Sequence, residues 1–125
     1  MAEDRKGFKI KEDGLGEVQV AEEVVTIIAG LATTEVEGVS SMGGNITKDL
    51  VSRLGMKNLA KGVRIEVDEG KINVFVAINI AYGYAIPAVS AKVQEKVKTA
   101  IENMTGLEVA GVNVKILDVD MKAEA

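Results

Sequence analysis

The sequence predicts an α+β fold, in which two main helices pack on one face of a two-layer, mixed but mainly antiparallel sheet of four to five strands. Two segments with strict alternation of apolar and polar residues flank a tight turn at Glu69-Gly70, which is typical of an antiparallel hairpin. Two longer segments repeat apolar residues every three or four positions, as amphipathic helices do. Only these two helices occur among the strands, and this order favours helices gathered on one face of a sheet.

The chain length of 125 residues fits a single domain, and its 47% apolar content is that of an ordinary globular protein. We expect this domain over residues 14–121. Residues 1–13 are rich in charge and contain one aromatic residue, Phe8, so we expect a flexible N-terminal tail. Residues 122–125 are expected to form a short C-terminal tail.

The first half of the domain is predicted to contain a short strand at 16–20, a helix over 21–35 and a second strand over 36–42. Glu22 and Glu23 lie in the first turn of this helix, where the helix dipole favours negative charge. This helix is expected to bury a broad face, because Val24, Ile28 and Leu31 lie at i, i+4 and i+7 and the stripe is widened by Val25, Ile27 and Ala32.

Residues 48–64 form a basic segment in an otherwise acidic chain. One interpretation is a docking site for an acidic partner, a phosphate or nucleic acid. The other is a set of scattered charges that keep a loop solvated. The segment has five cations against a single acid, Asp49: Lys48, Arg53, Lys57, Lys61 and Arg64.

The hairpin is predicted from strands at 63–68 and 72–81. In the second strand every other residue from Ile72 to Ile80 is a branched aliphatic, and the residues between them are mostly polar or small. This period of two indicates a sheet that is covered on one side only. Phe75 falls on the face expected to be exposed.

The second helix is predicted over 87–104, because Pro87 suits a first helical turn and Gly106 suits a left-handed stop. Its apolar positions are Val89, Val93, Val97, Ile101 and Met104. A last strand follows over 112–121. Its apolar phase shifts near Ile116-Leu117, which indicates either a bulge or a strand end covered on both sides.

The chain lacks the residues on which most catalytic sites depend. It contains no histidine and no cysteine, which removes the usual general base, the commonest metal ligand and every thiolate. Carboxylates spaced two apart, at Glu66 and Asp68 and at Asp118 and Asp120, are interpreted as solvated strand positions. We therefore predict no catalytic residues, no cofactor and no metal site.

Several features predict a cytoplasmic protein without direct membrane insertion. The charged start of the chain does not resemble a signal peptide. The longest uninterrupted apolar run, residues 74–78, is far shorter than the ~20 residues that cross a bilayer. The net charge of -4 argues against a bulk electrostatic attraction to nucleic acid or anionic lipid.

A loop before Pro87 contains two of the four aromatic residues of the chain, Tyr82 and Tyr84. Tyrosine is favoured at protein interfaces, and it also serves as a lid over a core, so both interpretations stay open. Together with the basic segment and the exposed sheet face, this loop supplies the candidate partner-binding residues: Arg53, Lys57, Asn58, Lys61, Arg64, Phe75, Tyr82 and Tyr84.

An ordered set of short motifs resembles the alkaline shock protein family of Gram-positive bacteria, which is linked to cell-envelope stress. The resemblance covers about residues 14–121. One departure is Leu59-Ala60, where the family often has a His-Gly pair. The motifs are Gly16-Glu-Val-Gln-Val20, Glu37-Gly-Val39, Lys57-Asn58 with Lys61-Gly-Val63, Tyr82-Gly with Ile86-Pro87, and Met104-Thr-Gly-Leu107 with Val112-Asn-Val114.

The resemblance implies a non-enzymatic, self-associating adaptor that binds a protein partner in cell-envelope homeostasis. In some members the partner is membrane-anchored and gathers the protein at the inner face of the membrane. Other, shorter members are associated with control of acetyl-CoA carboxylase and fatty-acid synthesis. The expected partners are thus a protein and further copies of the chain. The alternative is a nucleic-acid-binding module that uses residues 48–64, although the acidic net charge disfavours nucleic acid as a partner.

Overall fold

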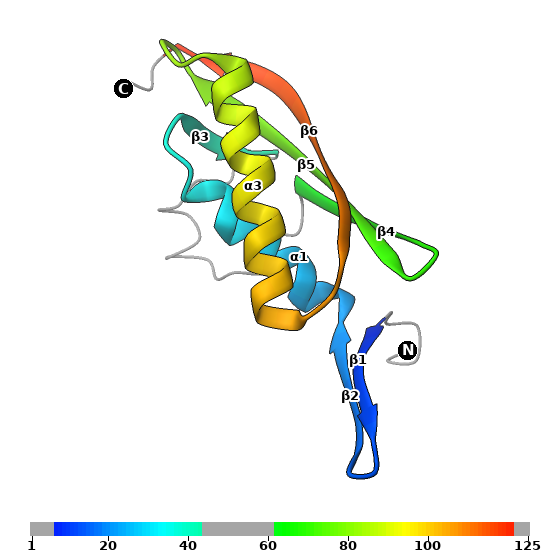
Figure 1. Cartoon of the computed structure of the whole chain (residues 1–125). Coiled ribbons are helices and arrows are strands. Elements are labelled where there is room, and N and C mark those ends of the chain that lie inside the picture. Colours follow the sequence, from blue (N-terminus) through cyan, green and yellow to red (C-terminus); the bar gives the residue numbers. More distant parts are fainter. Residues whose placement is uncertain (1–6, 44–61, 122–125) are drawn as a thin grey trace.

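The computed structural model describes residues 7–43 and 62–121 (Figure 1). The described residues form two helices, a two-stranded sheet and a four-stranded sheet, which confirms the predicted α+β fold. The elements in chain order are β1 (Gly7–Asp13), β2 (Gly16–Ala21), α1 (Glu22–Thr34), β3 (Val39–Met42), β4 (Val63–Asp68), β5 (Lys71–Ala81), α3 (Ile86–Thr105) and β6 (Val109–Asp120).

β5 is the central strand of the larger sheet. β6 pairs with it in parallel along residues 72–81, and α3 forms the crossover that a parallel connection needs. β4 pairs antiparallel with the first half of β5, and β3 pairs antiparallel with residues 78–80. Because β6 occupies one edge of β5 throughout, β3 and β4 share the other edge. The predicted hairpin of β4 and β5 is confirmed, with Glu69 and Gly70 both at positive φ in its turn.

The core lies between the larger sheet and the two helices, which cross its face side by side (Figure 1). On α3 the buried stripe repeats every four residues and ends at Thr105. The expectation that Met104 closes this stripe was wrong: its side chain is 70% exposed, because continued spacing of four places Thr105 inward. One face of β5 is buried against the helices at Ile72, Val74, Val76, Ile78 and Ile80.

The buried face of α1 is broad, as predicted, but it does not include Val24. Val24, expected inside, is 46% exposed, whereas Val25 is fully buried. Ile28 is buried as expected, and Leu31 is partly buried against Met42 in a small separate cluster. The face is broad because α1 contacts α3 and several strands, and Val25 and Ala32 belong to it as expected.

A strand occupies part of the expected N-terminal tail. Residues 7–13 form β1, which pairs antiparallel with β2 in a hairpin that projects from the body (Figure 1). Phe8 and Val20 anchor the base of this hairpin on the core. At its turn the amide of Leu15 donates to Asp13 Oδ1 at 2.8 Å. Residues 1–6 and the expected tail at 122–125 lie outside the described residues.

The phase shift in the last strand is a bulge. Ile116 pairs with Ile78, whereas Asp118 pairs with the next residue of β5, Asn79. Leu117 is therefore the extra residue of the bulge. The bulge lets Ile116 and Val119 contribute to the same helix-facing side although three positions separate them.

Candidate functional site

The open face of the larger sheet, opposite the two described helices, carries aligned polar and aromatic side chains. Phe75 of β5 pairs across the sheet with Arg64 of β4 on one side and with Asn113 of β6 on the other. Ala77, two residues further along β5, pairs with Lys115. Since residues two apart on a strand share a face, these side chains form one continuous surface.

The guanidinium of Arg64 lies over the ring of Phe75, with its central carbon 4.3 Å from the ring centroid. A cation on an aromatic face is stabilised by the ring quadrupole. Arg64 also makes an ion pair with Glu66, Nη2 to Oε2 at 3.5 Å, on a solvent-exposed stretch of β4. The two interactions hold Arg64 across the open face, where the sequence predicts Phe75 to lie; Arg64 was expected as the last cation of the basic segment.

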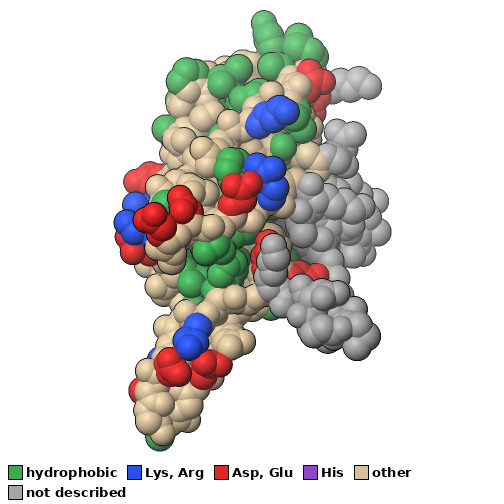
Figure 2. All heavy atoms as spheres, turned by 90° about the vertical axis from the view of Figure 1, so that its right-hand side faces the viewer, with side chains coloured by type: hydrophobic (Ala, Val, Ile, Leu, Met, Phe, Trp, Pro, Cys, Tyr) green, Lys and Arg blue, Asp and Glu red, His purple; other side chains and the backbone are tan. Residues whose placement is uncertain are grey.

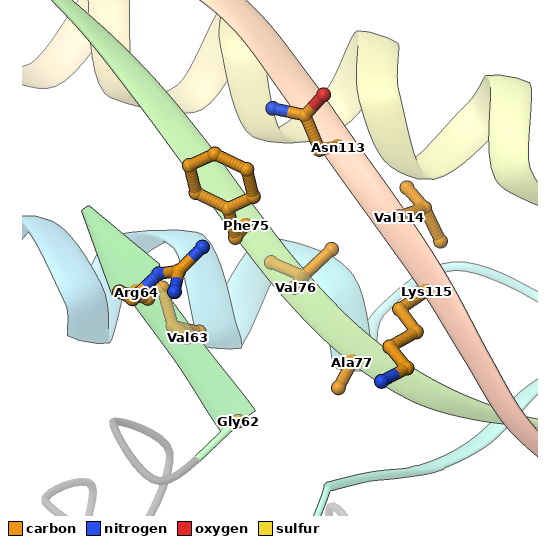
Figure 3. Close-up of a pocket in the computed structure, with 9 residues that line it drawn as sticks. All are labelled: Gly62, Val63, Arg64, Phe75, Val76, Ala77, Asn113, Val114 and Lys115. Atoms are coloured by element: carbon orange, nitrogen blue, oxygen red, sulfur yellow. The ribbon is translucent and has the colours of Figure 1, made fainter. Parts of the chain in front are cut away.

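Beside this pair the open face forms a hollow of about 380 Å³ (Figure 3). In the close-up, Phe75 and Arg64 stand at one end of it, and Lys115 extends towards Ala77 at the other. Its described lining contains two cations and no carboxylate. The hollow thus combines apolar surface with positive charge at its rim. The residues that line it are Gly62, Val63, Arg64, Phe75, Val76, Ala77, Asn113, Val114 and Lys115.

Gly43 and Gly62, the two described residues that flank positions 44–61, both lie at the border of this hollow. Gly43, which follows β3, donates its amide to the carbonyl of Ala77 at 2.8 Å, and Gly62 lines the hollow beside Ala77. The remaining candidates of the basic segment lie outside the described residues, so the structure does not place them: Arg53, Lys57, Asn58 and Lys61.

The two tyrosines of the loop before α3 have different environments. Tyr84 is partly buried, its ring packs beside Gly38, and its hydroxyl donates to Glu37 Oε2 at 3.1 Å. This hydrogen bond, more than burial, raises the pKa of Tyr84 above its ordinary value. The interpretation as a lid therefore holds for Tyr84. Tyr82 is 60% exposed and lies seven residues beyond Phe75, roughly 23 Å along an extended strand.

The structure consequently separates the described candidates into two places. Arg64 and Phe75 lie together on the open face, whereas Tyr82 lies at the end of the molecule where β5 and β6 end and α3 begins. Hydrophobic side chains gather at this end, at the top of Figure 2. Sequence periodicity missed this surface because the bulge turns Leu117 outward. The exposed large apolar residues there are Tyr82, Ile86, Leu117 and Met121.

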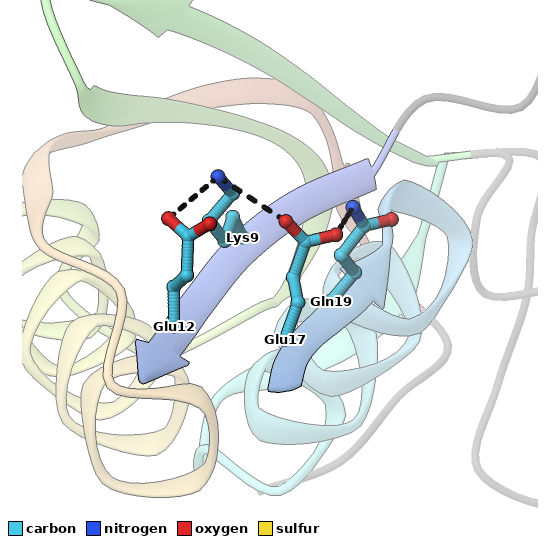
Figure 4. Close-up of polar contacts among 4 residues, drawn as sticks. All are labelled: Lys9, Glu12, Glu17 and Gln19. Atoms are coloured by element: carbon cyan, nitrogen blue, oxygen red, sulfur yellow. Dashed lines mark hydrogen bonds and ion pairs between the residues drawn. The ribbon is translucent and has the colours of Figure 1, made fainter. Parts of the chain in front are cut away.

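The β1–β2 hairpin is a further surface that the sequence analysis missed. Lys9 Nζ donates to Glu12 Oε1 at 3.1 Å and forms an ion pair with Glu17 Oε2 at 3.2 Å (Figure 4). These contacts raise the pKa of Lys9, chiefly through the Glu12 hydrogen bond. At the tip, Leu15 is 95% exposed. The alternation of Phe8 and Ile10 with lysines and the Asp13-Gly14 turn are signals that could have revealed this hairpin.

The described residues contain neither a cluster of metal-binding side chains nor a helix that could cross a membrane. No group of three acidic side chains is close enough there to hold a metal ion. The helices found over residues 7–43 and 62–121 are all too short or too polar to cross a membrane.

The sequence of the chain matches a known protein family and several relatives. Residues 10–121 match the model of the alkaline shock protein 23 family, described as having a cell envelope-related function. An uncharacterized Bacillus subtilis protein, YqhY, is 37% identical over 111 residues, which is 89% of this chain and 82% of that protein. Another uncharacterized B. subtilis protein, YloU, is 31% identical over 81% of this chain and 86% of its own length.

A third relative has a more informative name. A stress response regulator gls24 homolog of Streptococcus pyogenes serotype M3 is 27% identical over 87% of this chain and 62% of its own length. No solved structure matches the chain at a significant level.

Proposed function

The chain belongs to the alkaline shock protein 23 family, which has a cell envelope-related function, and within that role we propose that it is a non-enzymatic adaptor that binds a protein partner. The observation that carries the proposal is the hollow on the open sheet face. It presents the Arg64–Phe75 pair and Lys115 to solvent without a carboxylate in its described lining. Arginine and aromatic residues are enriched at the centres of protein interfaces.

Binding, rather than catalysis, fits the chemistry of this face. The ionisable side chains that line the hollow are Arg64 and Lys115, with Glu66 paired to Arg64 beside it, and the chain has no histidine or cysteine to serve as a base or nucleophile near neutral pH. The cations of the hollow are side chains on a sheet, which holds them at fixed spacing. An acidic segment of a partner would meet both cations and the ring of Phe75 at once.

Two finer roles belong to the same proposal. The adaptor associates with further copies of itself, and it reaches the inner face of the membrane through a membrane-anchored partner. A link to the control of acetyl-CoA carboxylase and fatty-acid synthesis is proposed from the resemblance to shorter family members. The name of the gls24 relative, a stress response regulator homolog, supports a stress-related context.

Affinity capture under mild crosslinking from native cells tests the partner-binding surface. The wild-type chain is compared with Arg64→Glu and Lys115→Glu, which alter the hollow, and with Lys98→Glu, an exposed position on α3 with the same change of charge. We expect a set of proteins that the wild type and Lys98→Glu capture and both hollow variants lose. Equal recovery by all four chains would exclude the hollow as the binding surface.

The alternative function is nucleic-acid binding through residues 48–64. The Arg64–Phe75 pair is the observation that favours nucleic-acid binding, because bases stack on aromatic and guanidinium planes. If it holds, binding to RNA or DNA weakens steeply with salt and falls on Lys57→Glu or Lys61→Glu. The adaptor proposal instead expects no mobility shift of nucleic acid even at low ionic strength.

A further inference from the structure

We propose that the hollow on the open sheet face receives the tip of the β1–β2 hairpin of a second copy of this chain. The inference rests on the proposed function, because it assumes that the hollow binds protein, and it names the occupant. The association is head-to-tail: one copy supplies the tip and the next supplies the hollow. Such heterologous contacts build rings or open chains rather than closed twofold dimers.

The hairpin has the form of an arm that does not fold back on its own body. Its base is anchored by Phe8 and Val20, while every residue from 11 to 19 is exposed. Leu15 at the tip is 95% exposed, the highest exposure among the large apolar side chains described. A side chain presented in this way gains no burial from its own chain, and its burial in another copy would be favourable.

The tip and the hollow are complementary in charge. The hairpin carries three acids, Glu12, Asp13 and Glu17, against Lys9 and Lys11. Lys9 forms ion pairs with Glu12 and Glu17, and Lys11 Nζ lies 3.6 Å from Asp13 Oδ2, so two lysines against three acids leave the hairpin with one net negative charge. The carboxylate of Asp13, which accepts the amide of Leu15 at 2.8 Å, stands directly beside the apolar tip. An apolar tip on a hairpin with a net negative charge thus faces a hollow whose described lining carries two cations, one of which, Arg64, also pairs with Glu66.

The hollow is suited to such a tip. Phe75 and Ala77 supply apolar surface for the leucine, and Arg64 and Lys115 stand at opposite ends of it (Figure 3). Both neighbours of Leu15 are glycines, Gly14 and Gly16, so no other side chain flanks it at the tip, and the space around both glycines is open. A narrow hairpin turn with one protruding aliphatic side chain can enter an open hollow on a sheet, whereas a partner with a broad flat surface cannot.

A complementation experiment tests the head-to-tail arrangement directly. Leu15→Glu removes the tip, and the double change Arg64→Glu with Lys115→Glu removes the hollow. Sedimentation velocity over a concentration series is expected to show association of the wild type and monomers for either variant alone. A mixture of the two variants is expected to form a 1:1 heterodimer that grows no further, because each partner keeps one intact half.

The controls separate this contact from general effects of charge. Met104→Glu matches the tip variant, and Lys92→Glu with Lys98→Glu matches the charge change of the hollow variant on the helical layer. Both controls are expected to associate like the wild type. A monomeric wild type, a mixture that stays monomeric, or a tip variant that still associates would each overturn the inference.

A crosslinking experiment reports the contact itself. The chain has no cysteine, so each introduced thiol is the only one in its copy, and peptide mapping distinguishes the mixed disulfide from the two homodimers. Leu15→Cys mixed with Ala77→Cys is expected to form an intermolecular disulfide at least about tenfold faster than Leu15→Cys mixed with Lys98→Cys, because the complex raises the effective thiol concentration. Equal rates would contradict the proposed contact.

The outcomes also distinguish this inference from the proposed function. If the hollow variants lose captured proteins while Leu15→Glu loses none and association is absent, the hollow binds a different protein. The adaptor function then stands, and the self-association through the hairpin fails.

Discussion

Gly43 and Gly62 meet across the break between β3 and β4: a Cβ built on Gly62 would lie 3.0 Å from the Gly43 amide nitrogen. Gly43 hydrogen-bonds the carbonyl of Ala77, and the Cβ position of Gly62 lies 3.4 Å from the same oxygen. The two residues therefore lie opposite one position of β5. Residues 44–61 separate β3 from β4 in the sequence, yet Gly43 and Gly62 keep the edge of the sheet continuous. The contact between these two glycines forms one border of the hollow.

This close approach predicts that Gly62→Ala is destabilising. The new methyl group would press on the backbone of Gly43 and on Met42 Cε, 3.1 Å away, and the sheet edge would have to move. We expect a loss of about 1–3 kcal/mol in the free energy of unfolding, measured by urea denaturation. Gly14→Ala is the control, because nothing lies within 4 Å of its Cβ position, and it should change stability by less than about 0.5 kcal/mol. Equal losses of stability in Gly62→Ala and Gly14→Ala would contradict the close approach of Gly62 to Gly43.

Gly38 and Gly83 allow backbone strain to be separated from crowding. Their φ angles are +101° and +100°, but a Cβ on Gly38 would lie 2.7 Å from Val89 Cγ2, whereas nothing lies within 4 Å of one on Gly83. We expect Gly83→Ala to cost about 1–2 kcal/mol from the left-handed backbone alone. Gly38→Ala should cost a further 1–3 kcal/mol, roughly, because it overpacks the core. Thermal or urea unfolding of both variants checks the difference, and identical losses would contradict the packing beside Val89.

The parts of the fold that were predictable from sequence are those set by local chemistry. Pro87 and Gly106 mark the ends of α3 within one residue, since both act through their own backbone. The phase shift at Leu117 located a bulge, because period-two alternation reports which side of a strand each residue faces. In contrast, β1 was missed: its anchor is the contact of Phe8 with a core built from distant residues, which composition near the terminus does not reveal.

Val97 and Lys98, adjacent on α3, test the orientation of this helix. Val97 is fully buried and Lys98 is exposed. Val97→Asp would bury an unpaired carboxylate and should destabilise the protein by about 3 kcal/mol or more. Lys98→Asp should change the free energy of unfolding by less than about 0.5 kcal/mol. Urea unfolding monitored by circular dichroism measures both, and similar small effects would mean that the helix presents a different face to the core.

The candidate site was only partly predictable for a related reason. Alternation alone placed Arg64 and Phe75 on the exposed face, and the register of β4 with β5 made them direct neighbours. Lys115 was not anticipated, because its position beside Ala77 depends on the parallel pairing of β6 with β5. A single strand pattern does not reveal which strand it pairs with. The separation of Tyr84 from Tyr82 likewise depends on Glu37 and Gly38, which are distant in sequence.

The hydrogen bond from Tyr84 to Glu37 predicts a specific response to alkaline pH. The bond favours the protonated phenol, so the pKa of Tyr84 is raised in the folded protein above the value of 10.0 that applies when the contact is absent. A pKa that is higher in the folded state means that the contact contributes its full stability below pH 10.0. This contribution is lost as the pH rises through the folded-state pKa.

Ultraviolet absorbance of the phenolate measures this shift. Tyr82→Phe leaves Tyr84 as the only phenol, and its titration midpoint is expected above 10.0. Adding Glu37→Gln removes the carboxylate, which is the main cause of the shift, and should move the midpoint back towards the ordinary value. In parallel, the free energy of unfolding of Tyr84→Phe should fall less steeply above pH 10.0 than that of the wild type. A midpoint that Glu37→Gln leaves unchanged would show that the two side chains do not interact in solution.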